Sequence, residues 1–332
     1  MSTTLSQIAI CTTDFYRSIV FYDRVVGMDD CFGTVAFRGP LAEMVQELPN
    51  PASKVRWFTD NSVFFQLEIF EFETPKPKPL PTHHSILSEG YNRLIIAVRS
   101  LEKFQRSMIE LGFFQDITIV QGEISRHGIT TDPDGNIIQL VEQANLINGE
   151  RDAQLIGVGI TSSQFEAAES DFRELFEFTK RADCFDTATV LAGEGKLIQT
   201  STLQINDKFI VLADFENSVQ HADDYLLSDA GIMNFAMGYE SQQDYIKAWN
   251  ATSQTGMHHS VPADDVPSEL GAYGTYATTR TNLSIEMQAI DKHAYGFWGF
   301  GPVTEEHREA MYQMTLAAVA EYKPSEDQAP TY

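Results

Sequence analysis

The sequence predicts an α+β protein made of four similar units, each a strand, a helix and about three further strands. The first observation is an internal repeat. Residues 5–28 pass from an alternating apolar strand into a helix with one apolar face, and residues 155–178 do the same. The matched apolar positions keep a constant separation of 150: Ile10 and Ile160, Phe15 and Phe165, Tyr22 and Phe172. This regularity indicates a duplicated unit.

A weaker repeat lies inside each half. A predicted strand over residues 93–98 leads to a helix over 101–111, and a strand over 233–239 leads to a helix over 242–249. Strand-like runs follow the helices, at residues 55–58, 63–72, 128–131 and 137–142. The Pro-rich stretch 74–84 is predicted to link the first two units. The expected organisation is a first module over 1–148, a second over 149–322 and a polar tail over 323–332.

The composition excludes several classes of protein. Hydrophobic residues make up 43% and charged residues 21%, as in ordinary globular chains. The 23 basic and 47 acidic residues give a net charge of −24, which disfavours binding to nucleic acid or anionic lipid. Three cysteines are too few for a disulfide framework, and no apolar stretch approaches the roughly 20 residues of a membrane span. Without a signal peptide or a phosphate-binding glycine loop, we expect a cytoplasmic protein with no nucleotide cofactor.

Two motifs carry a family resemblance. The opening strand leads to Ser18-x-x-Phe21-Tyr22 and then Gly27-Met28, and a later block reads Asp132-Pro-Asp-Gly-Asn-Ile-Ile-Gln-Leu140. With these motifs the chain resembles the vicinal oxygen chelate superfamily, which includes glyoxalase I, extradiol dioxygenases and bleomycin-resistance proteins. The resemblance implies four βαβββ units that form two modules with cupped mixed sheets. In the second half, Thr279–Met287 keeps the strand but has lost the Pro-Asp-Gly turn.

The resemblance also implies where a metal would be held, since the family places its ligands on four strands. In the first half these positions fall on Gln7, Glu68, Arg93 and Gln139. In the second half they fall on Gly157, about Ala213, Asn234 and Glu286. The histidines usual in the family are absent from these positions.

Two ways of pairing the units give two different sites. If neighbours pair, the first cavity holds Gln7, Glu68, Arg93 and Gln139, and the Arg93 guanidinium would stand in the metal's place and polarise a substrate carbonyl. If the outer units pair, Gln7, Glu68, Asn234 and Glu286 come together. Two carboxylates and two amides are hard ligands, which suit Mg²⁺, Mn²⁺ or Fe²⁺. A Glu68–Arg93 ion pair with only a structural role is a further interpretation.

Other residues are candidates for substrate contacts. Trp57 and Phe65 flank Glu68 and suggest an apolar or aromatic substrate, while Gln139 and His127 could line the first-half cavity. The aromatic segment Tyr295–Pro302 could cap a pocket, although a packing loop over a barrel mouth explains it equally well.

The expected function is that of a small-molecule enzyme of isomerase or lyase type. Glu68 or Glu286 would remove a proton beside a carbonyl or phenol, and a divalent metal or Arg93 would stabilise the enolate. One alternative is a non-catalytic protein that sequesters a small, antibiotic-like molecule. A second is an extradiol-type ring-cleavage dioxygenase. The partner would be a small molecule, with neither nucleic acid nor membrane, and the chain could be a monomer or a homodimer.

Overall fold

The computed structural model describes residues 3–31, 36–60, 62–191, 195–220, 225–263 and 271–301, together with Thr304, Glu305, Glu306, Glu309 and Gln313. The predicted tail over 323–332 and the last residue of the aromatic segment, Pro302, lie outside the described residues. No helix in the described residues is both long and apolar enough to cross a membrane.

The described strands form two mixed sheets. Nine of them make one sheet, in the order β15 (His258–His259), β16 (Ala272–Thr278), β17 (Ser284–Ile290), β14 (Gly231–Tyr239), β1 (Thr3–Cys11), β5 (Gln66–Thr74), β4 (Ala52–Thr59), β2 (Asp29–Asp30), with β3 (Ala36–Arg38) also paired to β4. Eight make the other, in the order β11 (Thr179–Arg181), β12 (Leu197–Ile205), β13 (Lys208–Phe215), β10 (Ala153–Thr161), β6 (Gly90–Val98), β9 (Ile137–Glu142), β8 (Arg126–Thr131), β7 (Thr118–Gln121).

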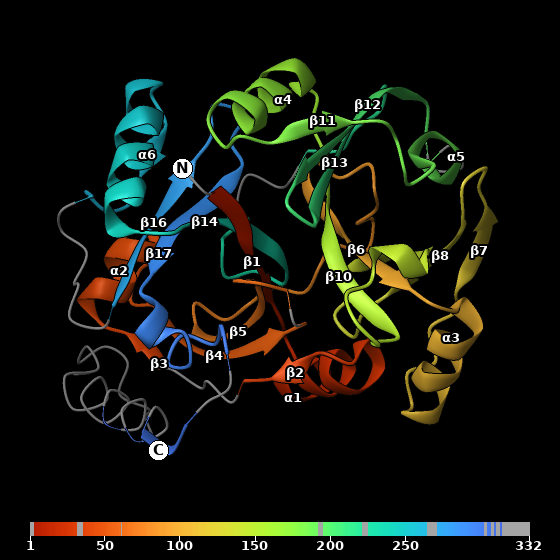
Figure 1. The fold of residues 1–332 in the computed structure, drawn as a ribbon, viewed down its shortest axis with the longest axis horizontal. Helices are drawn as coiled ribbons and strands as arrows, with labels where there is room; N and C mark the ends of the chain where they lie inside the picture. The colour runs from red at the N-terminus through yellow and green to blue at the C-terminus, as the bar shows by residue number, and fades with distance from the viewer. Residues whose placement is uncertain are drawn as a thin grey trace.

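Each sheet combines one unit from each half of the chain. In the nine-stranded sheet the first and fourth units meet where β1 runs antiparallel to β14. In the eight-stranded sheet the second and third units meet where β6 runs antiparallel to β10. Figure 1 shows this as red and orange strands beside blue ones, and yellow strands beside green ones. Of the two pairings that the sequence left open, the protein adopts the outer one.

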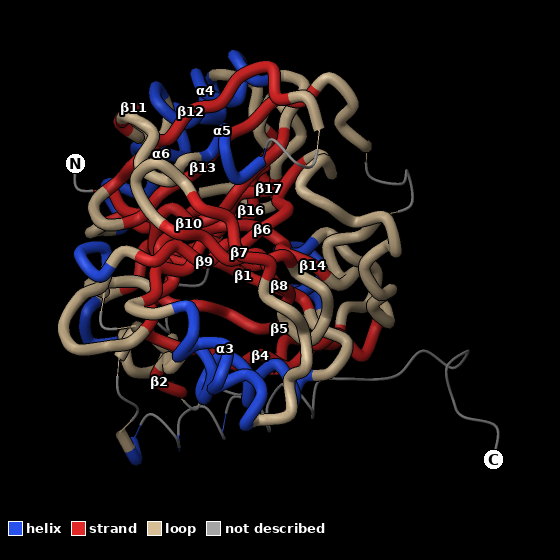
Figure 2. The backbone as a smooth tube through the Cα atoms, turned by 90° about the vertical axis from the view of Figure 1, so that its right-hand side faces the viewer, coloured by secondary structure: helices blue, strands red, loops and turns tan. Residues whose placement is uncertain are grey.

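Three of the described helices begin with a side-chain cap. The helices are α1 (Phe15–Val20), continued by a π-helical turn over Phe21–Val26, α2 (Pro40–Gln46), α3 (Leu101–Glu110), α4 (Phe165–Glu174), α5 (Thr187–Leu191) and α6 (Gln242–Gln254), with short 3₁₀ turns at Ala144–Leu146 and Lys292–Ala294. The side chains of Asp14, Ser100 and Ser241 accept hydrogen bonds from the first-turn amides of α1, α3 and α6. Strands run through the middle of the molecule, and α3, α4 and α6 lie toward its outside (Figure 2).

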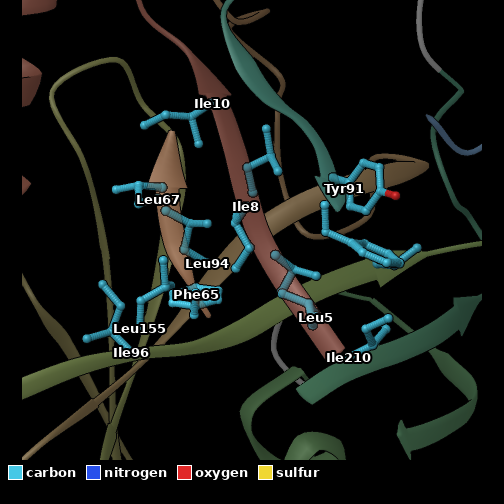
Figure 3. Packing of buried hydrophobic residues seen from close by; sticks show 14 of the residues in the cluster. Leu5, Ile8, Ile10, Phe65, Leu67, Tyr91, Leu94, Ile96, Leu155 and Ile210 are labelled. Carbon is cyan, nitrogen blue, oxygen red and sulfur yellow. The ribbon is translucent and has the colours of Figure 1, made fainter. Parts of the chain in front are cut away.

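The main hydrophobic core lies on one face of each sheet and unites the two sheets. Leu5, Ile8 and Ile10 of β1 and Leu94 and Ile96 of β6 are completely buried in it (Figure 3). The helices contribute residues to the same core, among them Phe21, Phe104, Phe172 and Tyr245. Because side chains alternate along a strand, the residues between these core positions face the other side of each sheet.

We call these opposite faces of the two sheets cups. The first cup is the face of the nine-stranded sheet that carries Gln7, Glu68, Asn234 and Glu286. The second cup is the face of the eight-stranded sheet that carries Arg93 and Gln139. Each is lined by an apolar cluster separate from the main core.

The Pro-Asp-Gly turn between β8 and β9 fastens the second unit to the first. Asp132 accepts hydrogen bonds from the Tyr22 hydroxyl at 2.8 Å and from the Asn136 side-chain amide at 2.8 Å. Asp134 accepts from the backbone amide of Thr13 at 2.7 Å and from the Ser18 hydroxyl at 2.9 Å. The turn at the start of the second motif therefore meets the first motif here and stabilises the fold, while Gln139 of the second motif lies in the second cup.

Candidate active site

Gln7 lies at the centre of the first cup. Its Nε2 donates to Oε2 of Glu68 on the adjacent strand β5, and lies 3.4 Å from Oε2 of Glu286 on β17. Its Oε1 accepts from Gln66 Nε2 at 3.1 Å and from Gln288 Nε2 at 3.0 Å. One amide from the first unit thus bridges carboxylates from the first and fourth units, which are 218 positions apart in the sequence (286 − 68).

The two carboxylates sit where ionisation is unfavourable. Burial and the nearby charge of Glu286 raise the pKa of Glu68 well above its usual range. Burial likewise raises the pKa of Glu286 to about 8. Glu68 is almost fully buried, whereas Glu286 is half-buried. Because two like charges share one amide, the pair holds at least one proton at neutral pH.

Trp57 fixes the orientation of Glu68. The indole Nε1 on β4 donates to Oε1 of Glu68 at 2.9 Å, so both carboxylate oxygens have donors. The segment that follows β17 covers this contact: the Trp298 ring lies edge-on to Trp57, with ring centres 6.2 Å apart. Gly299 has a φ of +76°, and a Cβ there would lie 2.4 Å from the Cβ of Trp57. The aromatic segment therefore packs over Trp57 at the first cup, which agrees with both interpretations of the sequence.

Tyr276 and Asn234 complete the polar lining. Tyr276 pairs across the strands with Glu286 and so faces the same side of the sheet. Burial, and then the charges of Glu286 and Glu68, raise the pKa of its phenol well above the usual range, so it stays protonated. Neither polar atom of the buried Asn234 amide makes a hydrogen bond of regular geometry with the described residues. Its interaction with the Tyr276 phenol nevertheless lowers the pKa of that phenol somewhat.

A hollow borders this polar lining at Tyr276. It has a volume of about 620 Å³ and reaches Tyr276 and Met233 from the side of α2 and the loop before β6. Its walls carry hydroxyl and amide side chains together with two acidic residues, Glu47 and Glu89. No Lys or Arg of the described residues lines it. The hollow therefore suits a neutral or cationic molecule better than an anionic one.

The first-cup residues fit a hard divalent cation. In the described part of the chain no three His, Cys, Asp or Glu side chains gather at one point, so a site here must draw on amides. Glu68, Glu286 and the buried Asn234 amide supply oxygen ligands of the kind that Mg²⁺ or Mn²⁺ takes. A cation among them would favour the ionised form of both carboxylates, against the burial that raises their pKa values. Gln7 would join the set after a half-turn of its amide, with Gln66 and Gln288 turning in step.

The structure does not bring all the predicted residues together. Arg93, Gln139 and His127 lie in the second cup, so Arg93 is remote from Glu68 and forms no ion pair with it. Phe65 lies on the opposite face of β5 from Glu68, in the main core, with Lys208 Nζ 3.7 Å from its ring centre. Phe65 directly precedes β5 and lies three positions before Glu68, and this odd offset puts it on that face because side chains alternate along extended chain.

The second cup has its own polar cluster. Arg93 Nε donates to Gln139 Oε1 at 3.0 Å, and Nη1 donates to Asn92 Oδ1 at 2.9 Å. His127 Nε2 lies 2.9 Å from Ser125 Oγ and 3.3 Å from Asp186 Oδ2. Burial lowers the pKa of His127, against the effect of Asp186.

Three residues of the first cup were missed from the sequence: Gln66, Gln288 and Tyr276. The signal for the two glutamines was present, since each lies two positions from a predicted ligand, Glu68 or Glu286, on the same strand and hence on the same face. Tyr276 could be found only from the register of β16 against β17.

Comparison with solved structures identifies the fold. Glyoxalase I from Zea mays is 14% identical, with a TM-score of 0.58 over 89% of this chain and 94% of that one. A proposed dioxygenase from Bacillus subtilis is 11% identical, with a TM-score of 0.60 over 95% of this chain and 97% of that one. No protein-family model and no curated protein matches the sequence.

Two mixed sheets built from four βαβββ units, with similarity to these structures along most of the chain, define the protein class. The chain has the vicinal oxygen chelate fold, in the arrangement that carries two modules on one polypeptide.

Proposed function

We propose that the first cup is the active site of an enzyme that moves a proton beside a carbonyl of a small, uncharged, largely apolar substrate. One observation carries the proposal: Glu68 and Glu286, from units at opposite ends of the chain, share the Gln7 amide in a buried setting. Unpaired carboxylates are costly to bury, so a protein that only held a ring would gain nothing from this pair.

Glu286 is the better candidate for the base. Its pKa, raised by burial, lies near physiological pH, where a general base combines adequate ionisation with adequate basicity. It is also the more exposed carboxylate and adjoins Tyr276, which lines the hollow. Glu68 is held by Trp57 and Gln7 on both oxygens, an arrangement that favours a fixed ligand over a mobile base.

Tyr276 supplies the complementary group. Its phenol stays protonated and can donate a hydrogen bond to the oxygen on which charge develops. A divalent cation held by Gln7, Glu68, Asn234 and Glu286 would polarise the same carbonyl, and Glu286 would leave the cation to act as the base. The aromatic cap of Trp298 over Trp57 would exclude water from the reacting atoms.

Proton exchange tests the catalytic proposal directly. The probe is 2-hydroxyacetophenone, dissolved in D₂O with Mg²⁺ or Mn²⁺. We expect the enzyme to exchange the carbon-bound hydrogen beside the carbonyl for deuterium, and the loss of that proton's NMR signal measures the rate. Glu286→Gln should slow the exchange by about 10²-fold or more. Glu43→Gln, an exposed carboxylate on α2, is the matched control and should exchange at the wild-type rate.

Three results would count against this assignment. Equal exchange by Glu286→Gln and wild type would remove Glu286 as the base. Saturable binding of the probe without exchange would favour the sequestering alternative. Oxygen uptake on a catechol with Fe²⁺ would favour the ring-cleavage alternative.

Cation binding is measured separately. Titration with Mn²⁺, monitored by electron paramagnetic resonance, should show one binding site in wild type. The affinity of this site for Mn²⁺ should be at least about tenfold lower in Glu68→Gln and in Glu286→Gln. Wild-type affinity in both variants would contradict the ligand set.

A further inference from the structure

The second cup contains a buried cation whose charge no carboxylate of the described residues offsets. Arg93 is 0% exposed, and its hydrogen-bond acceptors are the neutral amide oxygens of Gln139 and Asn92. No Asp or Glu in the described ranges lies within ion-pair distance of it. Burying a charge without a counter-charge costs several kcal/mol, so such a group is expected to serve a partner.

Two N–H donors in this cup are left over. Arg93 Nη2 and Gln139 Nε2 are buried and make no hydrogen bond within the described part of the chain. The residues lie on the adjacent strands β6 and β9, and their Nε–Oε1 hydrogen bond keeps the two side chains together. Two neighbouring donors, one of them charged, match the two oxygens of a carboxylate.

The guanidinium is held in a prepared cradle. Gly159 is its cross-strand neighbour on β10, and a Cβ there would lie 2.2 Å from Cζ of Arg93. Asn92 is itself fixed, because its Nδ2 donates to the carbonyl oxygen of Ser88 at 2.9 Å and to Thr161 Oγ1 at 2.9 Å. Arg93 therefore has a defined position that only a residue without a side chain opposite it allows.

A hollow with both apolar and polar lining residues, Asp116 among them, lies next to this pair of donors. It has a volume of about 450 Å³ and is lined in part by Ile129 and Ile137, the cross-strand neighbours of Gln139 and Arg93. Ile86 and Val190, which also line it, belong to the apolar cluster that covers this cup. The hollow is within the size range of small-molecule sites.

We propose that the second cup binds a small monocarboxylate with an apolar body. The carboxylate accepts hydrogen bonds from the free N–H groups of Arg93 and Gln139, and the apolar body lies against Ile129 and Ile137. Because Arg93 is fully buried, the side chain of Ile86 or Val190 must move to admit the ligand. Neither Glu68 nor Glu286 takes part, so this site is separate from the proposed active site.

Benzoate is the probe for this site. Calorimetric titration of the full chain in chloride-free buffer should give saturable binding at one site, and thermal stability should rise with benzoate concentration. Benzamide, which has the same shape without the charge, should bind at least about tenfold more weakly. Glu286→Gln should bind benzoate like wild type, which separates this result from any failure of the proposed active site.

Two variants test whether Arg93 and Gln139 bind the carboxylate. Arg93→Met removes the charge at similar volume and should lose at least about tenfold in affinity. Gln139→Glu places a carboxylate beside the guanidinium; it should fold, since it pairs the buried charge, and should abolish benzoate binding.

The proposal would be overturned by any of three results. The first is no saturation with wild type up to about 10 mM benzoate. The second is wild-type affinity in either Arg93→Met or Gln139→Glu. The third is equal stabilisation by chloride and benzoate, which would reduce the site to one for an inorganic anion.

Discussion

At the scale of single residues, the first cup shows how one amide can bring two carboxylates together. Gln7 can donate to Glu68 and Glu286 only because its Oε1 is held by Gln66 and Gln288. Its position in the centre of β1, between β5 and β14, places it within reach of both units. The ionisation of these carboxylates is therefore coupled to the stability of the fold.

Glu286 should make stability fall as pH rises. Burial raises its pKa from the ordinary 4.5 to about 8, so the folded protein holds the proton more tightly than the unfolded chain. The stabilisation is fully present below pH 4.5 and is lost as pH rises through 8. Urea unfolding in the presence of a chelator should show the unfolding free energy of wild type falling as pH rises, and that of Glu286→Gln falling less. At pH 9 Glu286→Gln should be the more stable protein by on the order of 1–3 kcal/mol. A parallel decline in both proteins would contradict the prediction; Glu43→Gln is the control.

A glycine at position 159 should be required for full stability, because the Arg93 side chain occupies the space that a Cβ would take. A methyl group at Gly159 would lie 2.2 Å from Cζ of Arg93, so Gly159→Ala should cost about 1–3 kcal/mol of unfolding free energy. With Arg93→Met the flexible thioether can give way, and the cost should fall by at least about 0.5 kcal/mol in a double-mutant cycle. Additive costs would show that some other contact, such as the backbone of β10, is responsible.

At the scale of elements, the β8–β9 turn acts as a fastening between units. The Asp132 carboxylate is buried and accepts from the Tyr22 hydroxyl, from the Asn136 side chain and from the backbone amides of Asp134 and Asn136. Through Tyr22 the turn is tied to the π-helical stretch that follows α1. The turn, which is part of a motif that carries the family resemblance, thus has a structural role.

Asp132→Ala should therefore destabilise the protein more than Tyr22→Phe. The alanine variant leaves several buried donors without a partner and should cost about 2–4 kcal/mol, whereas Tyr22→Phe removes one donor and should cost about 1 kcal/mol. Urea unfolding measures both. Proton exchange on the carbonyl probe should persist in the folded fraction of each variant, because neither residue lies in the first cup. Loss of exchange from a fully folded variant would show that the turn also shapes the site.

At the scale of the whole molecule, neither half of the chain can build a complete sheet by itself. The β1–β14 and β6–β10 seams each join a unit before residue 148 to one after it. The main core also runs continuously across both halves. Interleaving of this kind makes folding depend on contacts between distant parts of the chain.

Cutting the chain at the predicted boundary tests this dependence. Fragments 1–148 and 149–332 expressed separately should be insoluble or lack cooperative unfolding, because each exposes the seam strands and half of the core. Expressed together, they should purify as a one-to-one complex with the near-ultraviolet circular dichroism of the intact protein. A soluble, monomeric fragment 1–148 with cooperative unfolding would contradict the interleaved arrangement.

The sequence alone determined the unit structure of this protein. The repeat of Ile10 and Tyr22 as Ile160 and Phe172 reports apolar periodicity, which is a local property of strands and helices. The family resemblance pointed to Gln7, Glu68 and Glu286, and strand alternation could then have identified Gln66 and Gln288. The resemblance named the fold correctly for the same reason, since its motifs are turns and strand starts.

Only the tertiary structure decided which units share a sheet. Neighbouring and outer pairing satisfy the same alternation, so Arg93 could stand beside Glu68 in one and be remote from it in the other. The choice depends on the strand registers at β1–β14 and β6–β10, between residues more than 50 positions apart along the chain. Those contacts place Glu286 rather than Arg93 next to Glu68, and they leave Arg93 as a buried cation with donors to spare.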